Sequence, residues 1–187
     1  MTTQEKNGIT EGVIWKQLLI FFFPILVGSF FQQLYNTVDS VIVGQFVGKE
    51  ALSSVGGSAG QIISLVVGFF TGVSTGATVI ISQYFGAGKK EEIEESLHTA
   101  YAFALVGGLV LGIAGIVFAP QMLRWMNTPE ELIAESVLYV RVYFSGLIFI
   151  FIYNMGAAIL RAVGDSKRPL YYLIVCSVVN IILDLLL

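Results

Sequence analysis

Five long apolar stretches constrain the fold of this 187-residue chain more than any other feature of its sequence. A helix needs about 20 predominantly apolar residues to cross roughly 30 Å of hydrocarbon. Short polar segments with turn residues separate the stretches. The sequence therefore predicts an all-α, polytopic transmembrane bundle with spans at Leu18–Val43, Val55–Ser82, Thr99–Leu123, Val137–Leu160 and Leu170–Leu187.

Composition and motifs argue against nucleic-acid binding and against enzymatic activity. Hydrophobic residues make up 56% of the chain and charged residues 12%, whereas a soluble domain usually carries about 25% charged residues. No run is basic enough for nucleic acid. We find no pairing of nucleophile and base and no metal-ligand spacing. The segment from Gly86 to Lys89 lacks the strand context and the Ser/Thr of a phosphate-binding loop. We expect neither an enzyme nor a cofactor.

Lysine and arginine residues predict the orientation of the spans, because they concentrate on the cytoplasmic side. If the N-terminus is cytoplasmic, seven basic residues lie inside: Lys6, Lys16, Lys89, Lys90, Arg161, Lys167 and Arg168. Three then lie outside: Lys49, Arg124 and Arg141. This excess favours a cytoplasmic N-terminus, with the first, third and fifth spans running outward.

Two spans carry small residues at intervals of four, which places them on one helix face. The second span has Gly68, Gly72 and Gly76, and the third has Ala100, Ala104, Gly108 and Gly112. Membrane helices associate closely through such residues, so we expect helix packing at both. An alternative for the second span is a wet cavity, lined by its polar residues Gln61, Ser64, Thr71, Thr75, Thr78 and Ser82.

Acidic and amide residues inside the first and last spans are the main candidates for a functional site. Gln32, Asn36 and Asp39 share one helix face, and Asn180 and Asp184 share another. A carboxylate at bilayer depth costs at least about 2.5–3.5 kcal/mol and often marks an ion or proton pathway. The alternative is a purely structural role, in which each residue lies at the membrane interface or joins helices by hydrogen bonds.

Both carboxylates fall in the outer half of the predicted bilayer, so the two faces can meet there. Two carboxylates in one dry pocket require a cation between them, or a proton on one of them. Oxygen ligands alone suit a proton or a hard cation such as Na⁺. Pro24 removes one backbone hydrogen bond from the first span and should kink it. We therefore predict a cation- or proton-coupling site at Asp39, Asn180 and Asp184, with Gln32 and Asn36 supporting it.

Four sequence segments together resemble a known transporter family. They begin at Pro24-Ile25-Leu26 with Gln32 to Asp39 and Val43-Gly44, and continue with Ser82 to Gly88, Arg161 to Asp165 and Asn180 to Asp184. Their order and spacing resemble the MATE (multidrug and toxic compound extrusion) transporters along nearly the whole chain. The sequence is most similar to the bacterial NorM/DinF-like branch.

The resemblance implies a cation-coupled antiporter, driven by H⁺ or Na⁺, that exports organic cations and amphipathic drugs. It carries the N-lobe cation site onto Asp39, Asn180 and Asp184, and the kink-forming proline onto Pro24. It also implies a bacterial inner membrane and twelve helices in two lobes. The chain then represents most of an N-lobe, and its partners are the sixth helix, the C-lobe and membrane lipid.

Two other functions remain open at this stage. One is a lipid-linked oligosaccharide flippase of the same superfamily, which needs basic residues inside the lobe to hold pyrophosphate. Here the buried charges are acidic, while Arg124, Arg141 and Arg161 lie near helix ends. The other is a non-transporting membrane scaffold or a simple channel.

Overall fold

The computed structural model describes residues 13–47, 53 and 56–186, without the side chains of residues 46, 47, 184 and 185. Every element in this part of the chain is helical. In order, the elements are α1 (Ile14–Ile42), the π-helix η1 (Val43–Val47), α3 (Ser58–Gly86), α4 (Lys90–Trp125), α5 (Glu130–Ser145), α6 (Leu147–Ala162) and α7 (Lys167–Leu186). The all-helical fold predicted from the sequence is confirmed.

Three of these helices are individually long and apolar enough to cross a membrane: α1 with its extension to Gln45, α3 and α4. A fourth span is obtained if α5 and α6 are counted as one broken helix. The fifth expected span corresponds to α7, which is not one of the candidate spans among the described residues. Of the expected boundaries, Val55 and Leu187 lie outside the described residues, as do Lys6 and Lys49, which entered the orientation count.

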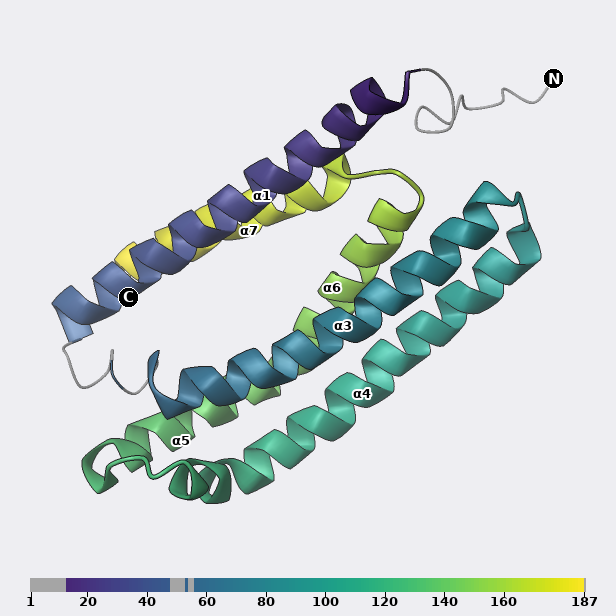
Figure 1. The fold of residues 1–187 in the computed structure, drawn as a ribbon. Helices are drawn as coiled ribbons and strands as arrows, with labels where there is room; N and C mark the ends of the chain where they lie inside the picture. The colour runs from purple at the N-terminus through teal and green to yellow at the C-terminus, as the bar shows by residue number, and fades with distance from the viewer. Residues whose placement is uncertain (1–12, 48–52, 54–55, 187) are drawn as a thin grey trace.

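The helices form two groups that pack differently. Helices α3, α4, α5 and α6 pack against one another in a block, whereas α1 packs along α7. Figure 1 shows the α1–α7 pair lying beside the block, joined to it through the turn between α6 and α7. The same view shows that α1 and α7 run in the same direction. This agrees with the sequence prediction that the first and last spans cross the membrane the same way.

Small residues on α4 allow the block to pack closely. Ala100, Ala104, Gly108, Gly112 and Gly115 are all buried. A Cβ atom at Gly108 would lie 2.9 Å from the Cα of Ile148, and one at Gly115 would lie 1.7 Å from the Phe144 ring. The packing role predicted for the small residues of this helix is therefore confirmed.

The glycine row of α3 behaves differently from the row of α4. Gly68, Gly72 and Gly76 are exposed, and no described residue lies within 4 Å of a Cβ built at any of them. The core of α3 lies on another face, where Phe70 stacks on Phe151 at 3.4 Å between ring centroids. The expectation that these glycines pack against a neighbouring helix is therefore wrong within the described part of the chain.

Two helix boundaries differ from the sequence prediction. Helix α4 begins at Lys90 instead of Thr99, and Glu91 and Glu92 lie in its first turn. Acidic residues at that position favour a helix through its dipole.

The expected span Val137–Leu160 is divided into α5 and α6, which meet at an angle of 49° around Gly146. The Ser145 hydroxyl donates to the Val142 carbonyl at this break (2.6 Å), and glycine is a poor helix former.

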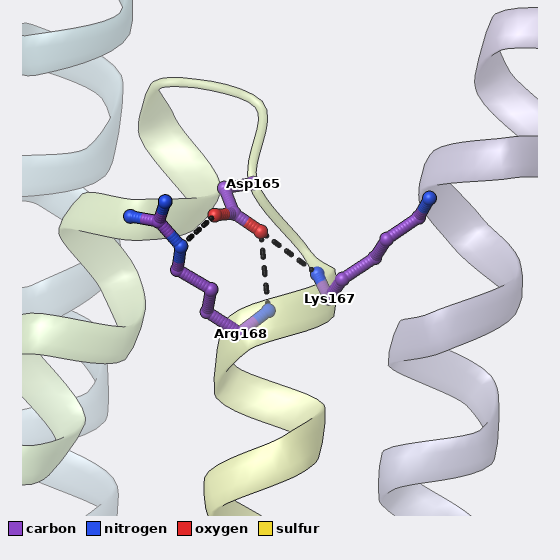
Figure 2. Close-up of polar contacts among 3 residues, drawn as sticks. All are labelled: Asp165, Lys167 and Arg168. Atoms are coloured by element: carbon purple, nitrogen blue, oxygen red, sulfur yellow. Dashed lines mark hydrogen bonds and ion pairs between the residues drawn. The ribbon is translucent and has the colours of Figure 1, made fainter.

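The turn before α7 is held by one carboxylate. Oδ1 of Asp165 accepts hydrogen bonds from the backbone N–H groups of Lys167 and Arg168, each at 3.1 Å. Its Oδ2 pairs with the Arg168 guanidinium at 3.1 Å. Figure 2 shows these contacts and the Lys167 side chain extending away from Asp165. Because the first N–H groups of a helix lack partners within it, Asp165 fixes where α7 begins.

Candidate functional site

The contact between α1 and α7 fixes the register of the candidate cation-site residues. A Cβ at Gly28 would lie 3.5 Å from Leu173 and 3.6 Å from Leu170. Asp39 follows Gly28 by eleven residues, and parallel helices rise equally, at about 1.5 Å per residue. The backbone of Asp39 is therefore level with residues 181–184, in the stretch of α7 that contains Asn180 and Asp184.

Asp39 and Asn180 are both half-buried, and one side-chain oxygen of each, Oδ1, is fully buried. The Asn180 Oδ1 accepts no hydrogen bond from the described residues. The side chain of Asp184 lies outside the described residues. Carboxylate and amide oxygens are ligands that suit a proton or a hard cation, and the coupling site at Asp39, Asn180 and Asp184 remains a prediction.

The residues predicted to support this site lie in a different environment. Gln32 and Asn36 are exposed on α1. The Asn36 amide donates to the Gln33 side chain of its own helix, at 3.5 Å. Pro24 is buried within α1, which continues as one helix on both sides of it. The kink expected at Pro24 remains a prediction.

Tyrosines from the block surround the same region. Tyr139 of α5 lies within electrostatic range of Asp39, and Tyr143 lies within range of Tyr35 on α1. The Tyr139 and Tyr143 rings are 6.4 Å apart.

A cavity lined by several polar residues, with mainly apolar accessible surface, lies in the opposite half of the bundle. Its volume is about 360 Å³, and α1, α3 and α6 line it with Phe21, Thr71, Ser74, Thr75, Thr78, Ser82, Asn154, Ala158, Arg161 and Ala162. Phe21 is eighteen residues from Asp39 along α1, which corresponds to about 27 Å. The polar face predicted on the second span therefore borders a cavity, which lies away from Asp39. Gln61 and Ser64 do not line it.

Three residues of this cavity were missed by sequence reasoning. Ser74 and Asn154 are polar residues within apolar stretches, and this contrast with their neighbours could have identified them as candidates. Arg161 lies near a helix end, as expected, but it also lines the cavity. A position near a helix end therefore does not keep Arg161 out of the space between α3 and α6.

A second cavity of about 550 Å³ lies between α3, α4 and α6. Its walls are mainly apolar, with Phe103 and Met155 among them, and Glu92 and Glu95 lie at its acidic edge. Glu92 pairs with Lys89 at 3.1 Å. This groove therefore combines apolar surface with partly neutralised negative charge.

A bundle of apolar helices with cavities between them and buried side-chain oxygen atoms is typical of a membrane transport protein. The particular family follows from comparison with known sequences. The chain belongs to the MatE family, whose sequence model matches residues 24–186.

Two relatives from Bacillus subtilis illustrate the match. The chain is 33% identical to the probable multidrug resistance protein YoeA over 98% of this chain and 39% of that protein. It is 34% identical to the probable multidrug resistance protein YpnP over 93% of this chain and 39% of that protein. The chain therefore spans about two-fifths of the length of these relatives.

Solved structures agree with the sequence match. A MATE protein in complex with MaD3S superposes with a TM-score of 0.89 at 26% identity, over 98% of this chain and 41% of that one. A MOP superfamily transporter from Pyrococcus furiosus, described as having a binding pocket of reverse polarity, has the same TM-score and identity, over 98% and 40%. The fold described above is therefore the fold of part of a MATE transporter.

Proposed function

We propose that this chain forms part of a cation-coupled antiporter that exports organic cations and amphipathic drugs, driven by H⁺ or Na⁺. Asp39, Asn180 and Asp184 are its coupling residues. The observation that carries the proposal is the register of α1 and α7, which brings the backbone of Asp39 level with residues 181–184. Binding of a proton or cation on these two adjacent helices would change the charge between them.

The physical basis of coupling is the cost of burying charge. Two carboxylates close together in a dry site cannot both remain ionised without a cation. A bound proton or cation removes this repulsion, and its release restores it. A site of this kind therefore favours two different arrangements of α1 and α7, according to its occupancy.

The remaining parts of the proposal concern the whole transporter. The relatives are more than twice as long as the match, which supports a transport cycle that uses a sixth helix and a second lobe. Substrate would bind between the lobes, as it does in transporters built from structural repeats. We further propose that the protein resides in a bacterial inner membrane with its N-terminus in the cytoplasm.

The test is ion-driven efflux of ethidium by the full gene product in inverted membrane vesicles. Asp39→Asn and Asp184→Asn should each abolish efflux under both H⁺ and Na⁺ gradients, because neither variant can change charge at that position. Comparing the two gradients in the native protein identifies the coupling ion.

The matched control is Glu130→Gln, which removes an exposed carboxylate from the first turn of α5. This variant should export ethidium at the native rate. Undiminished efflux by both aspartate variants, at normal expression, would show that the assigned coupling site is wrong.

A further inference from the structure

The cavity between α1, α3 and α6 contains an uncompensated positive charge. Arg161 is half-buried at its edge. No carboxylate of the described residues lies within ion-pairing distance of it, and the nearby Asp165 pairs with Arg168 instead. A partly desolvated guanidinium without a carboxylate partner is an unusual feature, because buried charges are normally paired.

Most hydroxyl groups that line the cavity already donate a hydrogen bond. The Thr71, Thr75 and Ser82 hydroxyls each donate to a carbonyl of their own helix. Thr78 donates to the Ser74 carbonyl at 2.9 Å and approaches that of Ala158 at 3.3 Å.

The Ser74 hydroxyl is the exception. Ser74 is 4% exposed, and its Oγ has no hydrogen-bond partner among the described residues. Asn154 uses one amide N–H to bond the Ile150 carbonyl at 2.9 Å and retains another.

We propose that this cavity binds a phosphate group carried by an amphiphile. The free donors are the guanidinium N–H groups of Arg161, the Ser74 hydroxyl and the second amide N–H of Asn154, and all three residues line this one cavity. Arginine binds phosphate through paired N–H donors. The other hydroxyls, whose hydrogens are occupied, present lone pairs to any protonated phosphate oxygen or to water.

The shape of the cavity selects an amphiphile over a bare anion. A volume of about 360 Å³ is in the range of small-molecule sites, and Phe21, Ala158 and Ala162 add apolar wall to the polar donors. Helix α1 packs along α7 and not along α3, so an apolar chain can leave on that side. The phosphate belongs either to an acidic phospholipid or to a soluble phosphorylated amphiphile.

The site is independent of the proposed coupling site, which lies about 27 Å away along α1. Its test is therefore ligand binding by the full gene product in detergent, measured as the shift in thermal unfolding temperature with titrated dodecyl phosphate. The comparison amphiphile is dodecyltrimethylammonium, and inorganic phosphate tests the anion alone. Nanodiscs of phosphatidylglycerol or phosphatidylcholine test the lipid headgroup.

Arg161→Gln should weaken dodecyl phosphate binding about tenfold or more, and Ser74→Ala severalfold, because hydrogen bonds to charged groups are strong. Lys167→Gln is the matched control, since it removes one exposed positive charge six residues away. It should leave binding within about twofold. Ser74→Ala also keeps the test valid if Arg161→Gln does not fold, because it removes only one oxygen atom.

The two sources of phosphate give different results. Stabilisation of the native protein by dodecyl phosphate supports a soluble ligand, and stabilisation only in phosphatidylglycerol nanodiscs supports a lipid headgroup. In either case the effect must depend on Ser74 and Arg161. Equal stabilisation by the cationic amphiphile, or equal losses in Arg161→Gln and Lys167→Gln with no loss in Ser74→Ala, would overturn the proposal.

Discussion

The α3–α6 block and the α1–α7 pair are both built from apolar helices, yet α4 in the block buries more residues than α1 in the pair. In α4, seven residues are buried, and six of them are glycine or alanine, including Gly108 and Gly115. In α1, only Pro24 and Gly28 are buried. Hydrophobicity therefore does not determine which membrane helices pack closely.

The difference teaches where small residues matter. In lipid, apolar side chains gain little from association, so close backbone approach decides which helices form a compact block. Gly115 makes that approach possible by leaving room for the Phe144 ring. The α1–α7 pair lacks such a row and instead carries the acidic and amide residues of the proposed coupling site. The closely packed helices and the proposed coupling site are therefore in different parts of the fold.

The largest effect should follow from filling the tightest site in the block. In Gly115→Ala, the new Cβ would lie 1.7 Å from the Phe144 ring, so the buried ring must move. We expect a loss of about 1–3 kcal/mol, measured as a lower thermal unfolding temperature in detergent. Phe144→Leu in the same chain should recover part of the loss. Unchanged stability in Gly115→Ala would contradict the tight packing of α4.

A smaller effect is expected where α7 begins. Asp165→Ala removes the acceptor for the backbone N–H groups of Lys167 and Arg168, and loss of a helix cap costs about 0.5–2 kcal/mol. Because the loss falls on the α1–α7 pair, hydrogen exchange should increase in α7 and remain unchanged in α4. Equal increases in both helices would show that the two regions are not distinct. Asp165→Asn, which keeps an acceptor oxygen, is the control.

The contact between α3 and α6 should contribute less. Thr78→Val removes a hydroxyl that approaches the Ala158 carbonyl at 3.3 Å, and such hydrogen bonds in membrane proteins average about 0.6 kcal/mol. The same detergent unfolding assay should detect this modest loss. Thr75→Val, whose hydroxyl bonds only within its own helix, should have a still smaller effect. A larger loss of stability in Thr75→Val than in Thr78→Val would show that the contact between Thr78 and Ala158 does not stabilise the packing of α3 on α6.

The smallest effects should come from glycines outside the tight block interface. Gly72→Ala meets no described neighbour within 4 Å, and Gly28→Ala meets Leu173 only at ordinary contact distance, 3.5 Å. Both should be neutral or stabilising by up to about 1 kcal/mol, because alanine favours helix more than glycine does. Strong destabilisation by Gly72→Ala in the full gene product would show that another segment packs on this face of α3.

Sequence reasoning predicted much of the fold because long apolar runs have few alternatives in a membrane. It identified the small residues of α4 as packing residues. It also predicted a polar face on α3, which borders a cavity. It could not distinguish the glycines of α3 from those of α4, because both rows have the same spacing. The missed break at Gly146 and the early start of α4 reflect local hydrogen bonds and helix-dipole effects, which an apolar pattern does not report.

The sequence by itself determined the helical class, the family and the helix faces that carry Asp39 and Asn180. These follow from apolar length, from motifs and from the periodicity of a helix, all of which are local properties. Only the tertiary structure decided that Asp39 is level with residues 181–184, that Phe144 fills the space at Gly115, and that Arg161 and Ser74 share a cavity. Those relations join residues far apart in the chain, and they depend on how whole helices pack.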